Sequence, residues 1–387
     1  MPSGTLPYWR LSAFYFFFFA VLGGLAPYWG PYLAAQGYNA AEIGQLIAIL
    51  HGTKVIAPNL WGWIADYTGR RMLIVRVGAL LAFVSFCGVL VGTGFWWLAL
   101  VMAAFSFFWN AALPQFEANT MNHLGAAAHR YSRVRLWGSV GFIVAVLAFG
   151  ELIDRYGVGL LPGALLFLFA ALWVSAQLAP QAPMLVSRRE GEPILRVLFS
   201  PAVFGFFLAC FLLQASHGPY FAFFSIHLAD HGYGSSAIGG LWALGVVAEI
   251  LLFLVMHRLL PALGPRLLMS VALLLSALRW VLIGGLADVL PVLLFAQLLH
   301  AASFGVYHAV GISMVNHYFV GRNQGRGQAL YSSVTFGAGV ALGSLVAGLL
   351  WDTIGGAWTF YAAAASAAAA CVIAAVSLPS PQQRRAH

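Results

Sequence analysis

Long apolar runs separated by short polar stretches dominate the chain. Each run continues for about 20 residues, the length of helix that crosses a bilayer core about 30 Å thick. The runs are continuous and far longer than the alternating segments of about 10 residues that build a membrane β-barrel. The pattern therefore predicts an all-α integral membrane protein with twelve transmembrane helices, at 11–34, 41–65, 72–92, 95–119, 134–153, 159–179, 198–226, 236–257, 266–287, 290–316, 327–351 and 356–378.

Composition supports a lipid-solvated surface. Hydrophobic residues make up 61% of the 387 residues and charged residues only 8%, whereas soluble domains carry about 25% charged residues. The first run exceeds the apolar core of a signal peptide, and no obvious cleavage site precedes the second run. We therefore expect the first run to be retained as a membrane helix.

The placement of the basic residues predicts the orientation. With the N-terminus placed inside, most of the nineteen Lys and Arg residues fall at inner helix ends. This positive-inside pattern puts both termini in the cytoplasm and the chain in the cell inner (plasma) membrane, in contact with lipid. It also explains the formal charge of +8 without a nucleic-acid partner. The inner residues are Arg10, Arg70, Arg71, Arg76, Arg130, Arg133, Arg135, Arg188, Arg189, Arg196, Arg258, Arg266, Arg322, Arg326, Arg384 and Arg385.

Two internal repeats indicate two similar halves. GYNAAEIGQLIAI at 37–49 returns as GYGSSAIGGLWAL at 232–244, and GELIDRYG at 150–157 returns as GLLWDTIG at 348–355. Each half has six predicted spans and starts on the same side, which is typical of parallel repeats. We expect two pseudo-symmetric six-helix bundles, at 1–180 and 198–387, joined by a cytoplasmic linker at 181–197.

The loop after the second span carries a recognisable motif. GWIADYTGRRMLI at 62–74 resembles the signature loop of the major facilitator superfamily (MFS), although Tyr67 stands where a basic residue is usual. PQFEANT at 114–120 and YSRVRLWGSVGFI at 131–143 further resemble the phenylpropionate permease branch, which neighbours lactose permease and the nucleoside symporters. The resemblance implies alternating access, and members of that branch are proton-linked importers.

The signature loop predicts a conformational latch rather than a binding site. Gly69 supplies a turn with positive φ, and Asp66 lies where it can meet the positive end of a neighbouring helix. Arg70, followed by Arg71, can pair with Glu117 and hold the inner side closed in the outward-open state. Simple anchoring of the loop is the alternative.

Charges inside predicted spans are candidates for the substrate site, because charge in a membrane is costly. Lys54, the only lysine, lies near the middle of the second span, with His51 one turn before it. A substrate carboxylate or a structural charge pair would each satisfy Lys54. Glu249 occupies the equivalent position in the second half. It is either a proton or substrate residue or the ion-pair partner of Arg279.

A second constellation repeats between the halves. An aromatic residue followed by a hydrogen-bonding residue suits an amphipathic ligand, because the ring packs while the polar group orients it. Histidine can also change protonation near neutral pH, although a histidine bonded to a neighbouring helix is the plainer interpretation. The candidate substrate residues are Trp109, Asn110, Tyr307 and His308, with Gln214 and His217 as further ones, and His308 is a second candidate for proton coupling.

Other function classes lack their motifs. The sequence has neither the phosphate-binding loop of an ATP-driven pump nor an H-E-x-x-H zinc site, so we expect no enzyme activity, no cofactor and no metal. The sequence favours a monomeric secondary transporter that couples proton flow to uptake of a small organic, possibly aromatic, carboxylate. A symporter of a neutral sugar or nucleoside, a drug exporter, and a membrane ligand sensor are the alternatives.

Overall fold

The computed structural model describes residues 6–183, 197–320 and 323–378, and these ranges contain helices and no strand. The expected linker at 181–197 and several of the inner arginines lie largely or wholly outside the described residues. The helices of the first half of the sequence are α1 (Tyr8–Ala35), α2 (Ala40–Thr68), α3 (Arg71–Phe86), α4 (Phe95–Leu124), α5 (Tyr131–Tyr156) and α6 (Leu161–Leu178), with short 3₁₀ turns η1 (Cys87–Leu90), η2 (Gly125–Arg130) and η3 (Val158–Leu160).

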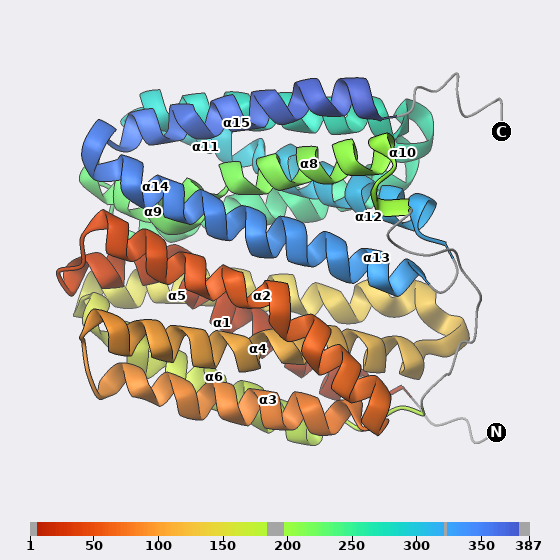
Figure 1. Ribbon diagram of the computed structural model, residues 1–387. Helices are drawn as coiled ribbons and strands as arrows, with labels where there is room; N and C mark the ends of the chain where they lie inside the picture. The colour runs from red at the N-terminus through yellow and green to blue at the C-terminus, as the bar shows by residue number, and fades with distance from the viewer. Residues whose placement is uncertain (1–5, 184–196, 321–322, 379–387) are drawn as a thin grey trace. The chain divides into compact units, whose positions relative to one another are not determined.

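The second half contains helices with more interruptions. They are α8 (Pro201–Ser216), α9 (Gly218–Asp230), α10 (Ser235–Gly285), α11 (Leu290–Leu298), α12 (Tyr307–Tyr318), α13 (Asn323–Ser332), α14 (Val340–Ile354) and α15 (Gly356–Ser377). Two π-helical segments, η4 (Ala301–Val306) and η5 (Ser333–Gly339), join α11 to α12 and α13 to α14. These elements are labelled in Figure 1.

Ten of the described helices are long and apolar enough to cross a membrane, so the chain is a multi-pass membrane protein. One of the ten, α10, has 51 residues, and Gly264 within it adopts φ +76° and ψ 159°, which are not helical angles. α2 is not among the ten.

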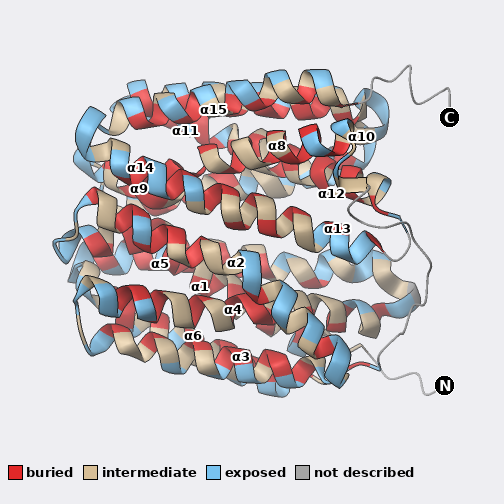
Figure 2. Cartoon of the chain, viewed as in Figure 1, coloured by how far each residue is buried: buried red, intermediate tan, exposed pale blue. Residues whose placement is uncertain are grey.

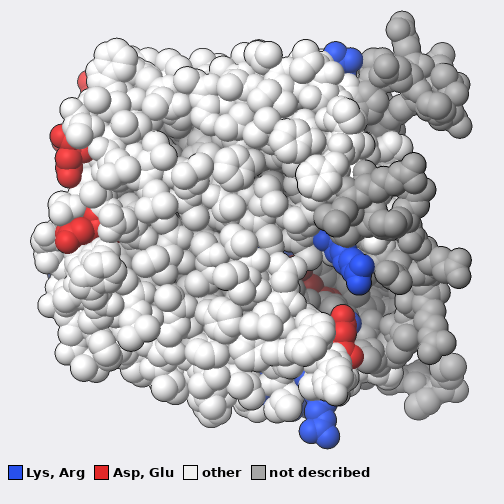
Figure 3. All heavy atoms as spheres, in the orientation of Figure 1, with Lys and Arg blue, Asp and Glu red and all other residues white. Residues whose placement is uncertain are grey.

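The exterior is apolar, as lipid exposure requires. Large hydrophobic side chains such as Trp96, Leu274 and Val376 are more than half exposed, and exposed positions run along the visible helices in Figure 2. On the face seen in Figure 3, a broad area between the helix ends carries no charged side chain. In water such a surface would cause the protein to aggregate, whereas in a bilayer the lipid tails solvate it.

The chain folds into two compact units. The first comprises Met1–Tyr38, Thr53–Ser187 and Gly234–Gly239, and the second comprises Asn39–Gly52, Arg188–Tyr233 and Gly240–His387. The units thus follow the two halves of the sequence, except that the start of α2 belongs to the second unit and the start of α10 to the first.

Within the first unit, α1 is the central helix. It packs along α5 and α6, while α3 packs along α4 and α6. Gly141 allows the closest approach, because a Cβ there would lie 2.1 Å from the carbonyl oxygen of Phe16. Arg76 donates hydrogen bonds to the carbonyls of Ala176 and Ala179 and so satisfies the end of α6.

Within the second unit, α8 has the central place. It contacts α15, η5 and α14, and α9 packs on α14. Small residues again set the spacing, because a Cβ at Gly343 would lie 2.0 Å from the carbonyl oxygen of Ala215. Arg266 donates to the carbonyl of Ala375 near the end of α15, as Arg76 does for α6.

Candidate functional site

A hydrogen-bonded polar cluster joins α2 to α4 beside the only lysine. Asn110 Nδ2 donates to the Thr53 hydroxyl at 2.9 Å, and that hydroxyl donates to the Ser106 hydroxyl at 2.9 Å. Lys54 follows Thr53 directly and is half-buried in the middle of α2. The structure therefore links the predicted site residue Asn110 to Thr53, which directly precedes Lys54 and which the sequence did not single out.

Trp109, the residue before Asn110, packs into the first unit. Its ring stacks on Phe18 of α1 with centroids 4.9 Å apart. Its indole Nε1 is buried without a hydrogen-bond partner among the described residues, and only 2% of the residue is exposed. A buried indole N–H normally finds an acceptor, so this donor is available to a ligand or water.

The second unit holds a matching polar cluster. Gln214 of α8, Tyr307 of α12 and Tyr331 of α13 are fully buried, and the Tyr307 hydroxyl interacts with both other side chains. The two tyrosine rings have centroids 6.3 Å apart. Within the described part of the chain, these polar side-chain groups make no hydrogen bond of normal geometry. Buried polar groups without good partners are costly in lipid, and they favour a place where water or a ligand binds.

Histidine rings line one face of the same region. His300, Phe304 and His308 follow one another at four-residue intervals, and their rings stack with centroid distances of 5.4 and 6.3 Å. The π-helical segment η4 lies between the two histidines, and η5 places Phe336 within 5.9 Å of the His308 ring. Single π-helical turns inside α-helices occur frequently at functional sites.

The acid predicted for proton coupling contacts a histidine. Glu249 Oε2 lies 3.6 Å from His300 Nε2, and both side chains are largely buried. Two glycines make room for them. A Cβ at Gly245 would lie 3.2 Å from the His300 ring, and a Cβ at Gly305 would lie 3.2 Å from Glu249 Cγ. α10 and η4 are thus fitted to each other around this acid–histidine pair.

Arg279, the expected alternative partner of Glu249, is fully buried. Its guanidinium donates to Gln297 Oε1 at 3.1 Å and to the Ser303 hydroxyl at 3.2 Å. It also lies over the rings of Tyr220 and Trp280, 4.3 and 4.6 Å from their centroids. Cation–π contacts and neutral acceptors therefore solvate this charge. The ion pair that the structure records for Glu249 is with His300.

The two remaining candidate histidines lie in the second unit, against aromatic rings. His217 Nδ1 is 2.9 Å from the carbonyl of Leu213, and its ring meets Trp280 edge-on at 4.9 Å. Its Nε2 has no hydrogen-bond partner among the described residues. The His51 ring lies 5.3 Å from that of Phe221.

The signature loop has the expected turn at Gly69, but its charged residues form ion pairs other than the expected one between Arg70 and Glu117. Gly69 has φ +68°. Asp66 Oδ1 accepts a hydrogen bond of 2.9 Å from Arg71, while Glu117 pairs with Arg135 of α5 at 3.6 Å. Arg135 also lies over the Phe19 ring, 4.0 Å from its centroid. The pairing of Arg70 with Glu117 stays a prediction for the outward-open state.

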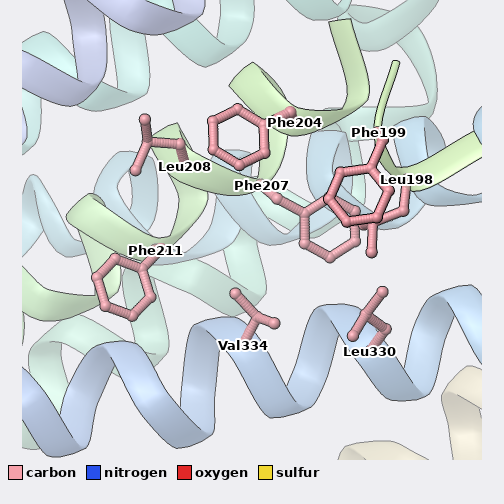
Figure 4. Close-up of a pocket in the computed structure, with 8 residues that line it drawn as sticks. All are labelled: Leu198, Phe199, Phe204, Phe207, Leu208, Phe211, Leu330 and Val334. Atoms are coloured by element: carbon pink, nitrogen blue, oxygen red, sulfur yellow. The ribbon is translucent and has the colours of Figure 1, made fainter. Parts of the chain in front are cut away.

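An apolar hollow adjoins the second polar cluster. Figure 4 shows its lining side chains, from α8 and its approach on one side and from α13 and η5 on the other. It can hold a ring but offers no charge to orient one. The residues that line the hollow are Leu198, Phe199, Phe204, Phe207, Leu208, Phe211, Leu330 and Val334.

In the described part of the chain, no group of three metal-ligating side chains could hold a metal ion.

Several site residues were not predicted from the sequence. Thr53, Ser106, Ser303 and Gln297 are polar residues in apolar helices, and in lipid such side chains seek partners on other helices. That tendency was the available signal. The sequence does not say which helix supplies the partner, so these contacts become visible only in three dimensions.

The profile of the MFS_1 like family matches residues 8–362. The chain is 29% identical over 357 residues to the probable 3-phenylpropionic acid transporter of Escherichia coli (strain K12), covering 89% of this chain and 91% of the relative. It is also 29% identical over 364 residues to the maltose permease of Geobacillus stearothermophilus, covering 90% and 89%.

Solved structures share the fold. A single-residue mutant of the nucleoside transporter NupG superposes with a TM-score of 0.84 at 16% identity, covering 96% of this chain and 100% of that one. The POT family transporter PepTSo superposes with a TM-score of 0.72 at 13% identity, covering 96% and 97%.

Proposed function

Because the chain belongs to the MFS_1 like family and is a transporter rather than an enzyme, we propose that it imports a small organic carboxylate together with protons. The favoured substrate has an aromatic ring and a flexible acid side chain. The E. coli relative is named for such an acid. Lys54 and Asn110 of the first unit would bind it, and alternating access would carry it across.

Lys54 is the observation that carries the substrate class. It is the only lysine of the chain and lies half-buried in the middle of α2. A cation at this depth is solvated by water, a counter-charge or an anionic ligand. The preceding residue, Thr53, is bonded through its hydroxyl to Asn110 of α4. A carboxylate bound by Lys54 would gain a charge-assisted hydrogen bond.

The proposed arrangement has twelve crossings in two bundles of six, at 1–180 and 198–387. The 51 residues of α10 would extend about 76 Å at 1.5 Å per residue, more than twice the bilayer core. The break at Gly264 supports a division of these residues into two crossings. With α2 as a further crossing, the ten candidate spans become twelve. The positive-inside rule then puts both termini in the cytoplasm.

Glu249 with His300 is the proposed proton site, and His308 is the second candidate. A carboxylate and an imidazole at 3.6 Å can share one proton and release it when their surroundings change. Arg279, Tyr220 and His217 face the same region. Arg279 places a permanent positive charge near His300.

A neutral sugar is the competing substrate, because the Geobacillus relative is a maltose permease. The test is uptake of radiolabelled 3-phenylpropionate into proteoliposomes with an imposed pH gradient, with protein-free liposomes correcting for passive entry of the neutral acid. We expect saturable, protonophore-sensitive uptake that benzoate-type acids inhibit and maltose does not. Inhibition by maltose alone would refute the carboxylate assignment.

A further inference from the structure

The sequence contains two repeated motifs, and the aspartate of one motif caps the helix that begins in the other. Asp154, from the repeat at 150–157, accepts hydrogen bonds from the backbone N–H groups of Ser235 and Ser236 at 2.7 and 2.8 Å. Asp352, from the repeat at 348–355, accepts one from the N–H of Ala40 at 3.3 Å. In both cases the aspartate near the end of one helix satisfies the first N–H groups of a helix from the other half of the sequence.

The spacing of the motif explains the geometry. In G-x-L-x-D the glycine precedes the aspartate by four residues, so both lie on one helix face. A Cβ at Gly150 would lie 2.7 Å from the carbonyl oxygen of Ser235, and one at Gly348 would lie 2.6 Å from that of Ala40. The glycine therefore lets the capped helix approach, and the aspartate meets its N-terminus one turn later.

The capped ends are symmetric as well. Gly37 and Gly232 open the other repeat with φ of +89° and +84°, and each turns the chain into its capped helix. The two caps lie in different units, because Asp154 and Ser235 belong to the first and Asp352 and Ala40 to the second. This is why each unit includes the first residues of a helix that continues in the other.

We propose that Asp154 and Asp352 form a two-part outer latch that holds the transporter closed on its outer side. Each carboxylate compensates N–H groups that have no partner within their own helix and lies at the positive end of the helix dipole. Opening the outer side must separate the capped helix ends from these aspartates. This inference rests on the alternating access of the proposed function.

Amide hydrogen–deuterium exchange of the purified full chain tests the latch without any substrate. One helix cap is worth about a fivefold change in an opening equilibrium. We expect Asp154→Ala to raise exchange about fivefold at 235–239 and also at 40–44, because one opening motion breaks both caps. Asp352→Ala should do the same, and the double variant should give roughly 25-fold, as independent effects multiply.

Asp288→Ala is the matched control, because Asp288 is an exposed acid whose recorded ion pair is with the side chain of His231. It should leave exchange at both segments unchanged. Faster exchange confined to the mutated end would show two separate structural caps and overturn the latch, as would no change at either end. If one variant is not recovered as folded protein, the other tests the proposal alone. Failed wild-type uptake of phenylpropionate would instead refute the substrate assignment.

Discussion

Asn110 of α4 donates a 2.9 Å hydrogen bond to the hydroxyl of Thr53, the residue that immediately precedes Lys54 on α2. The same hydroxyl donates to Ser106, so three polar side chains from two helices form one chain of hydrogen bonds. The bond thus ties α2, at the residue before the only lysine, to a side chain that lies 57 positions away from Thr53 in sequence.

Removing the Asn110 amide should weaken carboxylate binding. Asn110→Ala deletes the amide that we propose donates to the substrate, and one such hydrogen bond, worth about 1 kcal/mol, corresponds to about a fivefold rise in Kd. Calorimetry with phenylpropionate measures it. Asn59→Ala is the control, because the Asn59 amide donates to Val55 of its own helix. Equal losses in the two variants would count against a role for the cluster.

Neutralising Glu249 should uncouple transport from protons. Glu249→Gln keeps the size of the side chain but removes the acid that contacts His300. We expect uptake driven by a pH gradient to fall at least about tenfold, while exchange of internal for external substrate continues, because exchange needs no net proton release. Asp230→Asn, at the end of α9, is the control. Gradient-driven uptake that survives in Glu249→Gln would move the proton site elsewhere, with His308 next.

The signature loop should act on rate more than on affinity. Asp66→Asn removes the negative charge that pairs with Arg71, and Arg70→Ala removes the proposed partner of Glu117. Both should slow uptake several-fold while changing Kd less, because the loop biases conformations and does not contact the ligand. Stopped-flow fluorescence of conformational exchange is the second readout. Lost binding with unchanged exchange would contradict this role.

Single cysteines test the topology. With Cys87, Cys210 and Cys371 replaced, cysteines at positions 69 and 190 should react with an impermeant maleimide only from the cytoplasm, and one at position 230 only from outside. Position 190 lies outside the described residues and tests the expected linker directly. Labelling of 69 and 230 from the same side would refute the arrangement with twelve crossings.

The membrane class could be predicted from hydrophobic pattern alone, because run length and charge distribution depend on the bilayer and not on tertiary contacts. The Gly69 turn was equally local. Helix interruptions were less visible: η4 and η5 lie within apolar stretches and change the number of residues per turn without a distinct sequence sign. Within α10, Gly264 is the break between two stretches that the sequence already separates.

For the site, the sequence supplies candidate residues but not their partners. Lys54, Asn110 and Glu249 were recognised because charged or polar groups in lipid are rare. Their contacts depend on which helix faces which, so the bond from Asn110 to Thr53 and the pairing of Glu249 with His300 are visible only in the structure. Arg279 shows the same limit. It is surrounded by rings and neutral acceptors, and their spacing in the sequence does not reveal these contacts.

The assignment of Lys54 to a substrate carboxylate is the central claim. Losing a charge-assisted hydrogen bond should cost about 1.5–3 kcal/mol, on the order of a 10- to 100-fold loss of affinity. Lys54→Arg keeps the charge and should lose less, although its fork geometry displaces the ligand.

Isothermal titration calorimetry of phenylpropionate with the purified wild type and Lys54→Met tests this claim most directly. The account predicts saturable binding to the wild type and at least about tenfold weaker binding to Lys54→Met, with both proteins monodisperse and equally stable. Equal affinity of the two proteins for the anion would contradict it and make Lys54 a structural residue.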